Sequence, residues 1–154
     1  MQGRDLIDAS HRIFASPDGS VLRDGVRHPA EALPEAMRRV REFVGDDGAD
    51  LLPDRGAVSA ADDIALSTAH GSDGAWIAAH VHKGGSYETY FQGIERIMDD
   101  YDGRPHWGKL HFQNHTTLAP RYEGWDDFQR IRAEVDPDGR FSNPYTDRVL
   151  GPIR

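Results

Sequence analysis

The chain has 154 residues and a formal net charge of −8, a size that suits one domain built around a single core. So acidic a chain is a poor partner for nucleic acid or an anionic membrane surface, since both attract a basic face. Without a cysteine, it forms no disulfide, thiolate metal site or cysteine nucleophile. No secretory signal and no apolar stretch of membrane-spanning length are visible, so we expect a cytoplasmic protein, with peripheral membrane association left open.

The first regular element is an amphipathic helix. Its apolar residues recur at steps of three and four and share one helical stripe: Leu33, Met37, Val40 and Val44. We predict a helix that begins near Pro29 and ends before Gly45, with Pro34 tolerated in its first turn. The acidic segment 45–56 is rich in turn-forming residues and is predicted to be a loop. A strand is expected over residues 57–66.

A second strand and a second helix follow. Residues 74–82 alternate as a strand does. One predicted face holds Ile77, Ala79 and Val81, and the other holds Trp76, Ala78, His80 and His82. Residues 83–85 form a predicted turn, after which Ser86 can cap a helix that runs to about Tyr101. The apolar face of this helix comprises Tyr87, Tyr90, Phe91, Ile94, Ile97, Met98 and Tyr101.

A third helix is predicted after residues 121–124. It has acidic residues in its first turn and an apolar side made of Trp125, Phe128, Ile131 and Val135. Residues 136–145 are predicted to be a turn followed by an extended tail.

The order of elements indicates an α+β fold, an antiparallel or mixed sheet with helices packed on one side. We expect one domain over residues 1–154. The sequence has no G-x-G-x-x-G and no P-loop, so nothing in it would hold a nucleotide pyrophosphate by itself.

Several motifs occur in the order found in one enzyme family: RPHWGKLH at 104–111, LAPRYEGWDDFQRIRAEVDPDGRF at 118–141 and NPYTDRVLG at 143–151. With DASHRIFASP, HPAEALPEAMRRVRE, AADDIALSTAHG and WIAAHVH, they make most of the chain resemble the C-terminal domain of FAD-linked sugar oxidases. That family includes D-arabinono-1,4-lactone oxidase, L-gulono-1,4-lactone oxidase or dehydrogenase and alditol oxidase, within the vanillyl-alcohol-oxidase superfamily. The resemblance implies a substrate-binding cap over the isoalloxazine ring of FAD. The FAD itself would be held by a separate domain or subunit that has no counterpart here.

The resemblance also implies oxidation of a CH–OH group of a sugar lactone or alditol by hydride transfer to flavin. Such a step needs donors and positive charge where the oxygen becomes negative. By match to the family motif, Lys109 would contact the substrate hydroxyl or alkoxide, and His106 would orient it or accept its proton. The implied substrate contacts are His80, His82, Arg104, Trp107 and Arg55, and the implied flavin contacts are Asn143 and Tyr145. Arg104 is also expected to pair with a carboxylate or a backbone carbonyl.

Two segments depart from the family pattern. Where the family carries a glutamate and an arginine two residues apart on a pocket strand, this chain has Arg55 and Ala57. Where the family has a glutamate-rich strand, it reads GSVLRDGVRHP. These departures support a second hypothesis, an inactive diverged or truncated cap that acts as a non-enzymatic interaction domain.

The eight histidines raise a third hypothesis, in which His80 and His82 with His111 and His115 converge on zinc or iron. Without H-E-x-x-H or a comparable signature, we expect no metal site.

Overall fold

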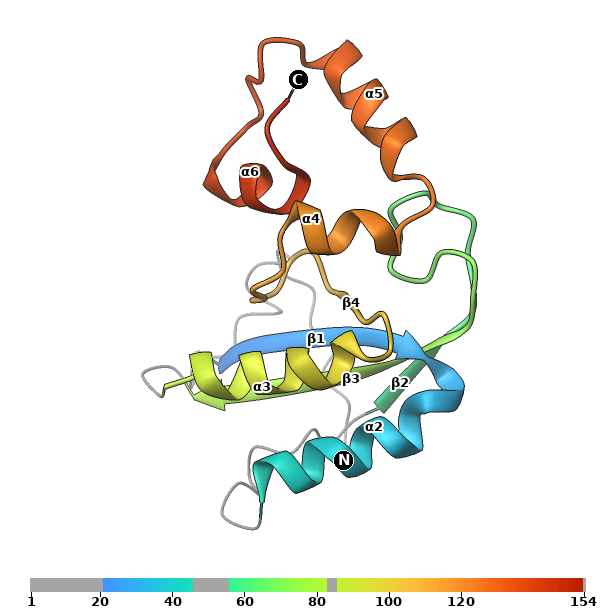
Figure 1. Ribbon diagram of the computed structural model, residues 1–154, viewed down its shortest axis with the longest axis vertical. Coiled ribbons are helices and arrows are strands. Elements are labelled where there is room, and N and C mark those ends of the chain that lie inside the picture. Colours follow the sequence, from blue (N-terminus) through green and yellow to red (C-terminus); the bar gives the residue numbers. More distant parts are fainter. Residues whose placement is uncertain (1–20, 46–55, 83–85, 154) are drawn as a thin grey trace, which may run out of the picture.

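The computed structural model describes residues 21–45, 56–82 and 86–153. Its sheet contains β1 (Val21–Pro29), β2 (Gly56–Ser59), β3 (Gly74–His82) and β4 (Arg104–Pro105). The strands are antiparallel and lie in the order β2-β3-β1-β4 (Figure 1). The helices are η1 (Ala30–Ala32), α2 (Leu33–Val44), α3 (Glu88–Asp99), α4 (His115–Leu118), η3 (Ala119–Arg121), α5 (Trp125–Val135) and α6 (Pro144–Leu150). The loop predicted at 45–56 and the turn predicted at 83–85 lie outside the described residues, except for Gly45 and Gly56.

Helices α2 and α3 pack on one face of the sheet. Their shared core consists of Val26, Ala36, Val40, Ile77, Ala79, Val81, Phe91, Ile94 and Met98. The predicted α+β fold with helices on one side of the sheet is confirmed. The predicted alternation in β3 is confirmed as well, because its other face holds the half-buried Trp76, Ala78 and His80. We call the sheet face that carries these three residues the open face, because the described helices α2 and α3 pack on the other one.

The ends of the first two helices differ in how well the sequence predicts them. The first helix is confirmed as η1 and α2, and Gly45 ends it with a φ of 68°, a positive value that glycine adopts readily. The prediction that Ser86 caps the second helix is wrong. Its N-cap is Tyr87, whose backbone N–H donates to the Glu88 carboxylate (3.2 Å). The helix ends at Asp99, just short of the expected end.

The strand predicted over residues 57–66 is correct only as far as Ser59. Beyond it, the Asp62 carboxylate accepts hydrogen bonds from the backbone N–H of Ile64 (3.1 Å) and from the Ser67 hydroxyl (2.5 Å). An aspartate that bonds the backbone two residues ahead of itself makes a turn. The chain therefore leaves the sheet and forms a loop before β3 begins.

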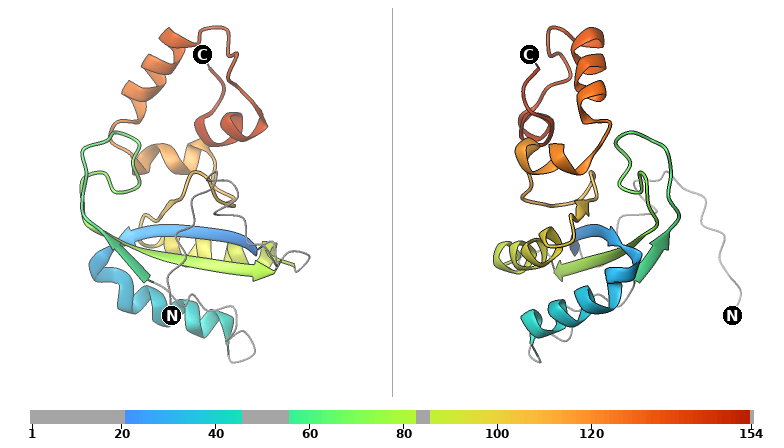
Figure 2. Two further views of the ribbon diagram at one scale, coloured as in Figure 1. Left: turned by 180° about the vertical axis from the view of Figure 1, so that it is seen from behind. Right: turned by 45° about the vertical axis from the view of Figure 1, so that its right-hand side comes forward.

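Helices α4, α5 and α6 form a second cluster away from α2 and α3 (Figure 2). Its buried apolar side chains are Leu118, Tyr122, Trp125 and Val149. The predicted apolar side of α5 is wrong beyond the first turn: Trp125 is buried, but Ile131 and Val135 are 49% and 75% exposed. Helix α5 runs away from the sheet, so its later turns lie apart from the buried part of the cluster (Figure 2). Where an extended tail is predicted, α6 begins at Pro144.

Among the described residues, every helix is too short or too polar to traverse a lipid bilayer.

Gly103 leads from α3 into β4, and a methyl group at this position would have no room. A Cβ there would lie 2.8 Å from the Met98 carbonyl oxygen and 2.8 Å from Cγ1 of Val26. Gly103→Ala is therefore expected to lower the free energy of unfolding by about 2 kcal/mol, because overpacking a filled core costs that order of energy. Urea unfolding followed by circular dichroism measures the loss. Gly108→Ala is the matched control, since the nearest atom to its Cβ would be 3.4 Å away. Equal stability of the two variants would contradict this account.

Candidate active site

A tight turn after β4 carries the two predicted catalytic residues. The backbone N–H of Lys109 donates to the His106 carbonyl (3.0 Å), and the N–H of Gly108 donates to Nδ1 of the His106 ring (3.0 Å). His106 is exposed, and its ring centroid lies 6.0 Å from that of Trp76. Lys109 is half-buried. The turn thus brings His106 to the open face, with Lys109 three residues further along.

The His106 ring is neutral, and its tautomer follows from its hydrogen bond. Partial desolvation of the ring lowers the pKa of His106, and the Lys109 ammonium lowers it further. Since the Gly108 amide can only donate, Nδ1 must accept, and the hydrogen of the neutral ring is on Nε2. A group that approaches Nε2 therefore meets an N–H and not a lone pair. This geometry favours the orienting role of His106 over the proton-accepting one.

One row of residues crosses all four strands. Ala57 of β2 lies opposite Trp76 of β3. Trp76 in turn lies opposite Arg27 of β1, and Arg27 lies opposite Arg104 of β4. Directly opposed residues of antiparallel strands point to the same face, so this cross-strand row lies on the open face. His80 is on that face too, four residues along β3 from Trp76, or about 13 Å at the ordinary rise of a strand.

Arg104 of the cross-strand row is held by the loop before β3. Its guanidinium donates to the carbonyls of Thr68 (3.3 Å) and His70 (2.8 Å). It also lies 4.9 Å from the centroid of the Tyr122 ring, within the range of a cation–π contact. The expected pairing of Arg104 with a backbone carbonyl is confirmed. Its expected contact with substrate stays a prediction.

Arg27 is a charged residue of this region that the sequence does not reveal. It is 3% exposed and donates to the carbonyl and the hydroxyl of Ser72, the latter at 2.9 Å. Gly74 leaves room for it, since a Cβ there would lie 2.0 Å from Arg27 Nε. Burial lowers the pKa of Arg27, and the neighbouring Arg104 acts in the same direction. The pairing of β1 with β4 brings the two arginines together, and no local motif signals that pairing.

Trp107 belongs to the second cluster. Its indole N–H donates to the Leu66 carbonyl (2.9 Å), and its ring stacks on Tyr122 with 5.5 Å between centroids. Buried tryptophan usually finds a partner for its N–H in this way. Trp107 therefore anchors the turn on the α4–α6 side, and its expected role in the substrate pocket stays a prediction.

The two predicted flavin contacts, Asn143 and Tyr145, make hydrogen bonds within the chain. The Asn143 side chain accepts from the backbone N–H groups of Tyr145 (3.0 Å) and Thr146 (3.1 Å), so it caps α6. The Tyr145 hydroxyl donates to the carbonyl of Trp107 and lies 3.1 Å from Nε2 of His111. Their contact with a flavin stays a prediction.

Two other predicted site residues fall at the limits of the described chain. Arg55 lies outside the described residues. His82 is the last residue of β3, and its side chain also lies outside the described part. Within the described ranges, no three His, Asp or Glu side chains are grouped in a way that could hold a metal ion.

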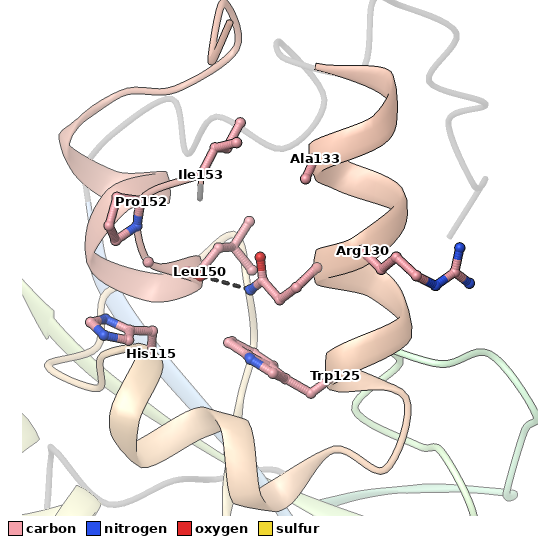
Figure 3. A pocket seen from close by; sticks show the side chains of 9 residues that line it. His115, Trp125, Arg130, Ala133, Leu150, Pro152 and Ile153 are labelled. Atoms are coloured by element: carbon pink, nitrogen blue, oxygen red, sulfur yellow. Dashed lines mark hydrogen bonds between the residues drawn. The ribbon is translucent and has the colours of Figure 1, made fainter. Parts of the chain in front are cut away.

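A hollow of about 380 Å³ lies between α5, α6 and the last residues of the chain (Figure 3). It is lined by His115, Trp125, Gln129, Arg130, Ala133, Leu150, Gly151, Pro152 and Ile153. Gln129 donates to the Leu150 carbonyl across it (2.7 Å), and the Arg130 side chain points outward (Figure 3). None of the predicted catalytic, substrate or flavin contacts lines this hollow.

The open face can stabilise an oxygen that becomes negative. His106 supplies a ring N–H, and the Lys109 ammonium lies close enough to lower the pKa of His106. Arg27 and Arg104 add two fixed positive charges nearby. Donors and charges held in place before a reaction stabilise developing negative charge without reorganisation. The alkoxide that forms when a carbinol loses its hydroxyl proton, before its carbon gives up hydride, is one such charge.

Residues 3–149 match the family described as D-arabinono-1,4-lactone oxidase. The chain belongs to this family. Its similar relatives include L-gulono-1,4-lactone dehydrogenase of Mycobacterium tuberculosis (strain ATCC 25618 / H37Rv), which is 48% identical over 125 residues, or 80% of this chain and 29% of the relative. Alditol oxidase of Streptomyces sp. is 33% identical over 126 residues, with the same two shares. L-gulonolactone oxidase of Scyliorhinus torazame is 34% identical over 94 residues, 58% of this chain and 21% of the relative. The chain thus spans less than a third of the length of each of these oxidases and dehydrogenases.

Acid is expected to lower the free energy of unfolding of this chain through His111. Burial lowers the pKa of His111 to about 4, and the nearby Arg148 guanidinium adds to this effect. Between pH 6.5 and about 4 the unfolded chain then binds more protons at this site than the folded chain. The free energy of unfolding therefore falls by about 3 kcal/mol as the pH drops through this window, and it is restored above pH 6.5.

Urea unfolding at pH 7.5 and pH 4 measures this loss against a His111→Gln variant, which lacks the titrating group. Arg148→Met is expected to shrink the pH-dependent loss without abolishing it, because burial is the larger cause. An identical pH dependence in the wild type and His111→Gln would contradict the assignment.

Proposed function

We propose that this chain forms the substrate-binding domain, over residues 1–154, of an FAD-dependent oxidoreductase. The reaction oxidises a CH–OH group of a sugar lactone or an alditol by hydride transfer to flavin. Its relatives are named for aldonolactones and alditols. The observation that carries the proposal is the turn that sets His106 beside Trp76 on the open face, with Lys109 three residues further along.

The residues present fit a flavin ring better than they fit a whole dinucleotide. The helices of the first core cover the opposite face of the sheet, and the open face offers half-buried Trp76, Ala78 and His80. These apolar and aromatic groups with a few donors suit a flat ring laid against them. The sequence has no Gly-rich phosphate loop, so we assign the pyrophosphate to a separate FAD-binding domain or subunit. Bound FAD would supply the hydride acceptor.

This chain's own residues would bind and orient the carbinol. The Lys109 ammonium would hold the substrate hydroxyl and stabilise the negative charge on its oxygen. The Nε2–H of His106 would donate to the same oxygen or to its neighbour. Because that nitrogen already carries a hydrogen, it cannot also take the hydroxyl proton. We assign that proton to His80, an imidazole on the same face of β3 as Trp76.

A chimera tests the proposal. This chain replaces the aligned segment of the Mycobacterium tuberculosis dehydrogenase, with which it shares 48% identity. The chimera is expected to bind FAD, and anaerobic L-gulono-1,4-lactone or an alditol is expected to bleach the flavin. Lys109→Met should slow flavin reduction by about 100-fold or more, since loss of one oxyanion donor has that effect. Stopped-flow absorbance measures the rate.

The control is Arg130→Met, which removes an exposed cation of α5 that pairs with Asp127 and Glu134. It should leave the rate unchanged. A chimera that holds FAD but is reduced by neither substrate class would contradict the proposal. An unchanged rate in Lys109→Met would remove Lys109 from the site.

One observation favours a second candidate, a non-enzymatic interaction domain. Ala57 stands where the family has an arginine, and it lies opposite Trp76 in the cross-strand row. A substrate contact is thus replaced by a methyl group at the edge of the open face. Exposed Ile131 and Val135 of α5 also offer apolar surface to a partner. An FAD-loaded but inert chimera would support this candidate.

Ala57→Arg is expected to improve catalysis if the open face binds substrate. The added guanidinium would donate to substrate hydroxyls beside Trp76, and a gain of about 1.4 kcal/mol corresponds to tenfold in kcat/KM. Steady-state kinetics of the chimera measure the gain. The matched control is Val58→Arg, because Val58 follows Ala57 on β2, faces the other way and is 77% exposed. An equal effect of both substitutions would show that charge alone, and not its place, matters.

A further inference from the structure

Both ends of one peptide unit in the turn are held by side chains. The unit joins Trp107 to Gly108. Its carbonyl oxygen accepts from the Tyr145 hydroxyl of α6, and its N–H donates to Nδ1 of His106 (3.0 Å). A peptide next to a glycine rotates readily, because no Cβ restricts it. These two hydrogen bonds therefore decide its orientation.

The hydrogens in this arrangement can be assigned. A carbonyl oxygen only accepts, so the single hydroxyl hydrogen of Tyr145 points to Trp107. Nε2 of His111, 3.1 Å from the same hydroxyl oxygen, must then donate. Nδ1 of His111 keeps a lone pair, and it is buried without a hydrogen-bond partner among the described residues. Burial favours this neutral ring, since it lowers the pKa of His111.

We propose that Tyr145 and His111 position the turn, and through it the His106 ring, by a one-way chain of hydrogen bonds. The chain runs from His111 Nε2–H to the Tyr145 hydroxyl, through the Trp107–Gly108 peptide, and ends at His106 Nδ1. Hydrogen bonds in such a series polarise one another. They leave His106 with its hydrogen on Nε2. The catalytic meaning of this arrangement rests on the proposed function, but its geometry does not.

Three contacts support a positioning role for Tyr145. Its ring meets the His111 ring edge-on, with 5.8 Å between centroids. The Arg148 guanidinium lies 5.3 Å from the Tyr145 ring centroid. Asn143 fixes the first turn of α6 through the backbone N–H of Tyr145. The ring and the backbone of Tyr145 are thus contacted by three residues, and these contacts fix the side chain whose hydroxyl reaches the Trp107 carbonyl. A tyrosine that only filled space would need no such alignment.

Nuclear magnetic resonance of the chain alone tests the proposal without flavin or substrate. Spectra of ¹⁵N-labelled histidine should show the Nε2–H tautomer for both His106 and His111 at neutral pH. Tyr145→Phe should raise the hydrogen-exchange rate of the Gly108 amide at least about fivefold, as expected for one lost neutral hydrogen bond. In the same variant, His106 should begin to populate the Nδ1–H tautomer.

Tyr122→Phe is the matched control. Tyr122 stacks under Trp107, and its buried hydroxyl has no hydrogen-bond partner among the described residues. This variant should leave Gly108 exchange and the His106 tautomer as in the wild type. An Nδ1–H tautomer of either histidine in the wild type would overturn the proposal, whether or not Tyr145→Phe folds. Equal Gly108 exchange in the wild type and in a folded Tyr145→Phe would overturn it too. An inert chimera would bear on the proposed function and leave this result untouched.

Discussion

The pairing of β4 with β1 holds the candidate site together. This ladder is only two residue pairs long, Val26 with Pro105 and Arg27 with Arg104, and so short a ladder is weak by itself. Contacts from neighbouring side chains hold β4 in place. The Arg121 guanidinium donates to the Gly103 carbonyl just before β4 and pairs with Asp99 at 2.7 Å. Since the turn with His106 follows β4 directly, the first core sets where that turn begins.

The second cluster sets where the same turn ends. Trp107 is stacked on Tyr122, and its carbonyl accepts from Tyr145. The turn is therefore bound on one side by the sheet and on the other by the α4–α6 helices. The sheet core and the α4–α6 cluster thus both contact this short turn. Support from both sides is what keeps functional side chains in place to within fractions of an ångström. An isolated loop would lack this support.

The two arginines of the cross-strand row, Arg27 and Arg104, would influence the site through their electrostatic potential and not through direct contact. Arg27 and Arg104 would repel each other strongly if nothing offset their charges. Backbone carbonyls and the face of Tyr122 take up Arg104, while Asp62 and Asp73 partly counter the lowered pKa of Arg27. Guanidinium groups that are so engaged keep their charge but are not free to follow a substrate. Their contribution is a fixed positive potential near the turn.

The sequence predicts elements whose cause is local and misses those whose cause is not. The alternation of residues 74–82 and the stripe of α2 follow from burial on one side, which periodicity records. The stripe of α5 has the same periodicity, yet Ile131 and Val135 are exposed, because periodicity shows an apolar side without showing that a partner covers it. The predicted strand at 57–66 ends early because one side-chain bond of Asp62 turns the backbone.

The candidate site, too, can be predicted from the sequence only where its residues belong to a local motif. Family resemblance of the motif run selects His106 and Lys109 as candidates, but Arg27 is found only through the register of β1 and β4. The link from His111 to Tyr145 spans 34 residues, and it depends on where α6 packs. No spacing rule reaches that far.

The departure at Ala57 gains a physical meaning from the cross-strand row. Compared with the family pattern, Ala57 simply replaces an arginine. In the sheet, Ala57 marks one end of a row whose other end carries two guanidiniums. Positive charge is therefore concentrated on the β1–β4 side, next to the turn, and is absent from the described β2 end. If the proposed reaction takes place over the open face, the alkoxide should develop near Lys109, beside the two guanidiniums.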